Sequence, residues 1–306
     1  MSNRYQGGFV TASYNGLLVP NAPTIGTATA TFGGITVAFT APSNVGGSAI
    51  TSYIATAKRT SDGVLFTASG ASSPITVTGL TAVSFTATVV AVNSYGPSAP
   101  SAASNSVTPL PAIGDAFGGG FFAGQISTAG NSIADYNLVV GPVASAQNTS
   151  KQWKTTNTST AGTDSVIDGP TNSSNMNNAS HPAAQFCEAV NVGGFTDWYM
   201  PARNELEVCY FNLKPTTTAN TSSGINPNAV PARASSYTSG NPAQTSATNF
   251  QDTGTEYFAA EFYWSSTQFS ADLARRQRFS NGYQSTNYDG GKTNSNHVRA
   301  IRRVAV

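Results

Sequence analysis

The chain has 306 residues, which is long for one β-sandwich and sufficient for two domains. Charged residues make up only 9% of the sequence, against roughly 25% in ordinary soluble domains, while Phe, Tyr and Trp make up 10%. With a net charge of +1, this composition excludes an intrinsically disordered chain and any long-range attraction to nucleic acid or anionic membranes.

Residues 1–20 form a Gly-, Tyr- and Asn-containing leader that is too short to bury a core of its own. The leader lacks the apolar region of a secretion signal, and no apolar run in the chain reaches the roughly 18–20 residues needed to cross a bilayer. We therefore expect no signal peptide and no membrane insertion. The leader either docks on a partner, through Arg4, Tyr5, Phe9 and Tyr14, or is a frayed terminus.

Residues 21–109 are predicted to form an all-β sandwich, because short alternating segments recur between turn signals. The expected strands are 27–31, 35–40, 50–58, 64–68, 75–78 and 85–92. The segments VAFTAP (37–42), GGSAITSY (46–53) and FTATVVAVNSYG (85–96) resemble a fibronectin type III domain. That family usually has a tyrosine where this chain has Phe85, so the resemblance implies a corner without the tyrosine's hydrogen bond.

A Pro-containing linker, 110–113, leads to a predicted second domain at 114–306. Helices are expected from about Ser180, as the N-cap, to Val190 and from about 202 to 212. The expected strands are 136–140, 262–267, 274–279 and 298–304. The polar stretch 214–255 is long for a loop, and loops of that length are usually functional or disordered.

Three motifs mark this second domain: GGFTDWYMP (193–201), YWSST (263–267) and VRAIRRV (298–304). In this order they resemble the C-terminal domain of Lcl-type collagen-like bacterial adhesins. That resemblance implies an α+β fold similar to C-type-lectin-like and formylglycine-generating-enzyme-like domains, with an adhesive surface that often binds glycans. Those enzymes use a late cysteine pair that this chain lacks after Cys209, so the similarity does not carry their activity.

Several motif residues are interpreted first as structural. Trp198 and Trp264 are expected in the core, and the charged residues are expected to form carboxylate–guanidinium pairs. These charged residues are Asp197, Glu205, Arg299, Arg302 and Arg303. The alternative is an anionic-glycan patch, which strand alternation would divide into two half-rows. Its members would be Arg275, Arg276, Arg278, Arg302 and Arg303.

The stretch 277–296 is the predicted binding segment, because its mixture of Tyr, Asn, Ser and Gly is typical of evolved binding loops. The candidate ligand-binding residues are Asn281, Tyr283, Asn287, Tyr288, Asn294 and Asn296. A solvated hairpin with ordinary turn residues at Asn281-Gly282 explains the composition equally well.

Chemistry-bearing residues are sparse, and we expect no enzyme, no cofactor and no metal site. The two histidines, His181 and His297, have no evident nucleophile beside them in sequence. Glu256 and Glu261 are the one loosely suggestive carboxylate pair for polysaccharide hydrolysis. Cys187 and Cys209 flank the helical region, so they either form a disulfide or remain free core thiols.

Together these observations favour a bacteriophage virion protein, either a tail fibre or a capsid decoration, whose lectin-like domain binds host-surface glycan. The leader would contact other virion proteins of the capsid or tail, which would place the chain on the virion surface. The alternatives are a bacterial cell-surface adhesin and a polysaccharide-active enzyme. Whether the chain forms a homo-oligomer is left open, because no heptad or collagen repeat is present to enforce one.

Overall fold

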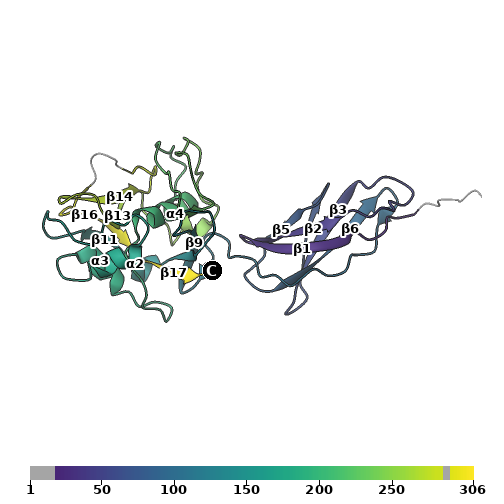
Figure 1. Ribbon diagram of the computed structural model, residues 1–306, viewed down its shortest axis with the longest axis horizontal. Coiled ribbons are helices and arrows are strands. Elements are labelled where there is room, and N and C mark those ends of the chain that lie inside the picture. The colour runs from purple at the N-terminus through teal and green to yellow at the C-terminus, as the bar shows by residue number, and fades with distance from the viewer. Residues whose placement is uncertain (1–17, 285–289) are drawn as a thin grey trace, which may run out of the picture. The chain divides into compact units, whose positions relative to one another are not determined.

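The computed structural model describes residues 18–284 and 290–306, and the chain folds into two compact units (Figure 1). The first unit is Met1–Ala112 and the second is Ile113–Val306. Each unit has its own hydrophobic core, so each is described by itself.

The first unit is a β-sandwich of two antiparallel sheets. One sheet has the order β1-β2-β5 and the other has the order β4-β3-β6-β7. The strands are β1 (Thr24–Thr31), β2 (Gly34–Thr40), β3 (Ser52–Arg59), β4 (Leu65–Gly70), β5 (Ile75–Thr78), β6 (Phe85–Asn93) and β7 (Gly96–Pro97). Along β6 every second residue is buried, which places one face of the sheet in the core. The sandwich predicted from period-two alternation is confirmed.

Phe85 fills the core position at which the resemblance implied a missing tyrosine hydroxyl. Its side chain is fully buried, and its ring meets the edge of the Phe66 ring with centroids 5.8 Å apart. Two backbone hydrogen bonds with Val107, of 2.8 and 2.9 Å, tie the start of β6 to the segment after β7, which packs against the same core. This corner is therefore closed by main-chain pairing.

The end of the predicted leader belongs to the sandwich. The Leu18 carbonyl accepts hydrogen bonds from the Gly47 amide and from the Asn93 side chain, at 2.9 and 3.0 Å. The boundary expected at residue 20 is therefore too late. The candidate attachment residues Arg4, Tyr5, Phe9 and Tyr14 lie outside the described residues.

The second unit contains two five-stranded sheets and four short helices. One sheet has the order β12-β9-β10-β17 with β8 beside β9, and the other has the order β11-β16-β13-β14-β15. The strands are β8 (Ala116–Phe117), β9 (Gly120–Ile126), β10 (Tyr136–Val140), β11 (Gln147–Gln152), β12 (Ala229–Val230), β13 (Phe262–Gln268), β14 (Leu273–Arg278), β15 (Gly290–Gly291), β16 (Ser295–Arg299) and β17 (Ile301–Ala305). The helices are α1 (Val143–Ala146), α2 (Gly169–Ser174), α3 (Pro182–Glu188), α4 (Arg203–Leu213) and the 3-10 turn η1 (Thr248–Phe250).

Two expectations for this unit are corrected. The helix expected from Ser180 begins at Pro182 with His181 as its N-cap, because the Ser180 backbone is used to pair with Thr155. The strand expected over 298–304 is two strands, β16 and β17, which lie in different sheets. The break falls at Ala300, whose amide and carbonyl bond to Ala146 and Gly141 instead of a sheet neighbour.

Residues 145–180 contain regular structure that was not predicted. β11 carries no apolar alternation, and α2 is made of Gly, Pro, Thr, Asn and Ser. Asp168 caps α2 by accepting a hydrogen bond from the Thr171 amide, and Pro170 lies in the first turn. Over the described ranges, no helix has the length and apolar character needed to cross a membrane.

Candidate functional site

An open pocket of about 340 Å³ lies in the second unit beside the first turn of α4. We call it the hydroxyl pocket, because four of its residues are Ser or Thr. Its lining residues are Arg203, Thr221, Ser222, Ser223, Gly224, Ile225, Ser236, Tyr283 and Gln284. Tyr283 and Ile225 are 40% and 52% exposed, so an aromatic ring and an aliphatic side chain border a polar floor.

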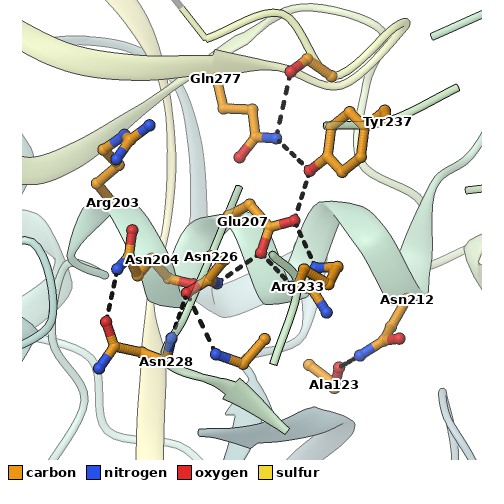
Figure 2. Close-up of polar contacts among 12 residues, drawn as sticks. Ala123, Arg203, Asn204, Glu207, Asn212, Asn226, Asn228, Arg233, Tyr237 and Gln277 are labelled. Atoms are coloured by element: carbon orange, nitrogen blue, oxygen red, sulfur yellow. Dashed lines mark hydrogen bonds and ion pairs between the residues drawn. The ribbon is translucent and has the colours of Figure 1, made fainter. Parts of the chain in front are cut away.

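The wall of the hydroxyl pocket is fastened to α4 through Glu207 (Figure 2). This buried carboxylate accepts hydrogen bonds from the Tyr237 hydroxyl at 2.6 Å, from the Asn226 amide at 2.5 Å and from two nitrogens of Arg233. These three donors all come from the polar stretch 214–255. A loop of this length is therefore held by charge-assisted hydrogen bonds to a helix.

A chain of side-chain hydrogen bonds leads from Glu207 to the pocket. The Gln277 amide donates to the Tyr237 hydroxyl at 3.4 Å, and the Gln284 amide donates to the Gln277 carbonyl oxygen at 3.2 Å. At the pocket itself, Arg203 donates to Gln284 at 3.2 Å. The lining residue Gln284 is thus oriented by the buried Gln277, and Gln284 in turn accepts from Arg203.

Tyr237 acts in this network as a hydrogen-bond donor. Burial, followed by the charge of Glu207, raises the pKa of Tyr237 well above its usual value, so the hydroxyl stays protonated. Gly224 lies against the Tyr237 ring with φ +95°, and a Cβ there would come within 1.9 Å of the ring. A glycine is therefore required at this point of the pocket wall.

A second pocket, of about 310 Å³, lies where β13 and β16 begin. We call it the strand-end pocket, and its lining residues are Thr149, Glu261, Phe262, Ser295, Asn296 and His297. Burial lowers the pKa of His297, and the neighbouring Glu261 opposes that shift. Within the described part of the chain, the Asn296 Nδ2 and the His297 Nδ1 are shielded atoms without a hydrogen-bond partner.

The predicted binding residues are distributed over this region. Tyr283 lines the hydroxyl pocket and Asn296 lines the strand-end pocket. Asn281 shapes the turn instead, because its side chain accepts from the Tyr283 amide and its carbonyl accepts from Thr221. Asn294 is an exposed turn residue bonded to Gly291. Asn287 and Tyr288 lie outside the described residues.

A larger pocket of about 580 Å³ has polar groups that are already engaged. Arg303 in its wall pairs with the buried Glu205 at 2.8 Å, and Asp168 caps α2. The Tyr199 hydroxyl also donates to Glu205, at 2.6 Å. The Arg303 and Asp168 side chains at this pocket therefore serve the fold.

The motif residues are mainly structural. Trp198 and Trp264 are buried, Arg302 pairs with both oxygens of Asp197 at 2.8 Å, and Arg299 pairs with Glu256 at 2.8 Å. The five-arginine patch does not form one surface, since Arg302 and Arg303 are engaged in pairs. Arg275 lies over Phe269, while Arg276 and Arg278 both lie over Phe262.

The carboxylates considered for hydrolysis have different surroundings. Glu256 accepts hydrogen bonds from the Arg299 guanidinium and the Val143 amide, both at 2.8 Å. Its carboxylate therefore links β16 to the start of α1. Glu261 lines the strand-end pocket. In the described ranges, no group of three His, Cys, Asp or Glu side chains could hold a metal ion.

The disulfide considered between Cys187 and Cys209 is absent, and both cysteines are free. Cys187 belongs to the cluster with Trp153 and Trp198, whereas Cys209 belongs to the other core cluster of the unit. Burial raises the pKa of both thiols, so they are inert core residues.

The hydroxyl pocket was only partly visible in the sequence. The length and polarity of 214–255 indicated a functional or disordered loop, and six lining residues come from this stretch. Gln284 and Tyr283 fall within the predicted binding segment 277–296, whereas Arg203 carried no signal, because α4 positions it at the pocket only in the folded chain.

Comparisons with known proteins agree with part of this interpretation. A model of the Lcl C-terminal domain family matches residues 143–302, just over half of the chain. No curated protein matches the sequence.

Solved structures match the chain over about a third of its length. Titin kinase with its flanking domains is 25% identical over 30% of this chain and 17% of its own, with a TM-score of 0.27. The match thus spans less than a fifth of that structure. Human cardiac titin module A71 is 26% identical over 29% of this chain and 92% of its own, with a TM-score of 0.27. The fibronectin type III domain of human fibronectin type III domain containing protein 3 is 24% identical over 34% and 97%, with a TM-score of 0.28. These scores are too low to establish a shared fold, and the sandwich of the first unit rests on its own strand pairing.

Proposed function

Because the chain belongs to the Lcl C-terminal domain family, we propose that it is a non-enzymatic adhesion protein whose second unit binds carbohydrate on a host surface. The observation that carries this proposal is the hydroxyl pocket. Its floor offers hydroxyl, amide and guanidinium groups, and its rim offers the half-exposed ring of Tyr283. Sugars need this combination, since they present hydroxyls at their edges and C–H groups on their faces.

A non-catalytic role is supported by what the polar groups of the region do. Glu205, Glu207 and Glu256 are each engaged by an arginine and serve to join distant segments. The α+β arrangement of the unit, with α4 beside two five-stranded sheets, supports a C-type-lectin-like fold as the scaffold for this binding surface.

The direct test is a glycan array probed with the full chain, followed by titration of the best ligand. We expect Tyr283→Ala to lower affinity by at least about tenfold, because one aromatic contact with the ligand is lost. Tyr257→Ala is the matched control, since Tyr257 is 37% exposed but lies outside the pocket. Equal affinity of both variants and the parent chain would remove the hydroxyl pocket from consideration.

We infer further that the protein is carried on a bacteriophage virion, as a fibre or capsid decoration, through its N-terminal residues. The support is the module order, a fibronectin-type sandwich followed by an adhesin-type domain, and a surface hydrated by hydroxyls and amides more than by ions. Mass spectrometry of purified particles tests this setting, comparing the full chain with a variant lacking residues 1–17.

The variant retains Leu18, so the contacts of Leu18 with Gly47 and Asn93 are preserved. Incorporation of the full chain and loss of the variant would support attachment through the N-terminus. Absence of both chains from particles would favour a bacterial surface adhesin.

A further inference from the structure

The hydroxyl pocket and the strand-end pocket lie at two ends of one row of side chains. Phe262 on β13 pairs directly with Arg278 on β14, and cross-strand partners share a face of the sheet. On one side of this pair, the Arg278 amide donates to the Tyr283 carbonyl at 3.0 Å. On the other side, Tyr263 pairs with His297, which places Asn296 beside Phe262 on β16.

Side-chain contacts support the same row. The Phe262 and Tyr283 rings meet edge to face with centroids 6.4 Å apart. Arg276 lies over the Phe262 ring at 4.0 Å and donates to the side-chain oxygen Oδ1 of Asn296 at 3.3 Å. Because neighbouring strands are about 4.8 Å apart, the row from Tyr283 to Asn296 extends about 14 Å. That length accommodates several linked sugar rings.

We propose that the two pockets are subsites of one groove, and that the ligand is a linear oligosaccharide chain that occupies both. This proposal rests on the carbohydrate-binding function proposed above. Tyr283 and the hydroxyl pocket bind one sugar unit, Phe262 borders the path between the pockets, and Asn296 contacts a later unit in the strand-end pocket.

The polar atoms of the strand-end pocket support the binding of a sugar unit there. The shielded Asn296 Nδ2 and His297 Nδ1 lack partners among the described residues, and such groups are costly when they are left unsatisfied. Hydroxyl groups of Thr149 and Ser295 line the same pocket and can exchange hydrogen bonds with a sugar, while the shielded amide and imidazole need a small side-chain shift to reach it. Glu261 adds a carboxylate that accepts from a second hydroxyl.

The test measures affinity against chain length by calorimetry, with the full protein. The probes are ladders from disaccharide to hexasaccharide of cellulose, chitin, xylan and hyaluronan. A groove with two subsites predicts that affinity for the best series rises by at least about tenfold from disaccharide to hexasaccharide.

Variants assign that gain to the strand-end pocket. Asn296→Ala is expected to reduce hexasaccharide affinity by about tenfold and to leave disaccharide affinity unchanged. Phe262→Ala is expected to reduce hexasaccharide affinity about tenfold more than disaccharide affinity, because its ring also contacts Tyr283. The matched controls are Phe269→Ala and Asn294→Ala. Phe269 also has an arginine, Arg275, over its ring, and Asn294 is an exposed turn residue. Neither control is expected to change either affinity.

The outcomes separate this inference from the proposed function. Equal affinity for short and long chains, or variants that weaken both equally, would overturn the two-subsite groove while carbohydrate binding stands. Failure of every ladder and of the glycan array to bind would overturn both. If Phe262→Ala does not fold, as judged by its tryptophan fluorescence, the substitution of the half-buried Asn296 by alanine alone decides.

Discussion

Glu207 on α4 is bound through both of its carboxylate oxygens by Arg233, which lies 26 residues further along the chain. The Glu207 side chain is 1% exposed, so this pair fixes the long polar stretch 214–255 to the core. The wall of the hydroxyl pocket depends on that attachment, because Tyr237 and Asn226 share the same carboxylate.

Removing this carboxylate is expected to destabilise the second unit strongly. Glu207→Ala leaves the Arg233 guanidinium, the Tyr237 hydroxyl and the Asn226 amide without their shared acceptor, and losses of this kind cost about 3–5 kcal/mol in the free energy of unfolding. Urea unfolding followed by tryptophan fluorescence measures this in the full chain, because Trp153, Trp198 and Trp264 all lie in the second unit.

The matched control is Asp197→Ala. It removes a carboxylate that also binds an arginine through two oxygens but is 55% exposed. We expect a smaller loss of unfolding free energy, since water already solvates this carboxylate and Arg302 keeps its hydrogen bond to the Gly118 carbonyl. Comparable losses for the two variants would show that burial does not determine the contribution of these pairs.

Arg299 is expected to resist replacement by lysine. Its guanidinium donates to the carbonyls of Gly141 and Glu256 and to the Glu256 carboxylate, with each bond made by a different nitrogen. A lysine ammonium cannot reach all three acceptors, so Arg299→Lys should cost about 2–4 kcal/mol. Thermal unfolding measures the loss, and Arg278→Lys on the exposed edge should leave the melting temperature unchanged.

Stability should fall as the pH drops below the ordinary pKa of histidine. Burial, followed by the charges of Lys154 and Lys292, lowers the pKa of His181 to about 4. The folded state therefore keeps this imidazole neutral, while the unfolded chain takes up a proton below about pH 6.5. The unfolding free energy thus decreases between about pH 6.5 and 4, and this contribution levels off below the folded pKa.

The variant His181→Asn tests this assignment. The His181 ring bonds to Thr160 and Asn178 at 2.8 and 2.9 Å, so the variant will be less stable at neutral pH. Its unfolding free energy should nevertheless change less than that of the parent chain between pH 7 and 5.5, where few carboxylates titrate. An unchanged slope in the variant would assign the pH dependence to other groups.

The two cysteines should be unreactive in the native protein. Both thiols are buried and burial raises the pKa of each, so neither the thiolate nor access for a reagent is available. We expect no labelling by iodoacetamide under native conditions and two labels per chain in urea without any reductant. Fewer than two labels in urea before reduction would indicate the disulfide that the structure lacks.

The local pattern of the sequence determined the first unit almost completely. Alternation of apolar and polar residues in segments such as 85–92 decides which face of a strand is buried, and this information needs no distant partner. The same holds for α4, whose predicted span of 202–212 differs by one residue from Arg203–Leu213.

Only the tertiary structure decided how the site is assembled. Arg302 pairs with Asp197 at a sequence separation of 105 residues, and Arg203 donates to Gln284 at a separation of 81. Local periodicity in the sequence does not predict such partners. Tertiary contacts also divide the predicted strand 298–304 at Ala300, where the main chain bonds to distant residues. They form β11 without apolar alternation, because its main chain pairs with β16. Side-chain patterns record burial along one element, whereas a pocket depends on which elements pack together, and that is settled only when the core forms.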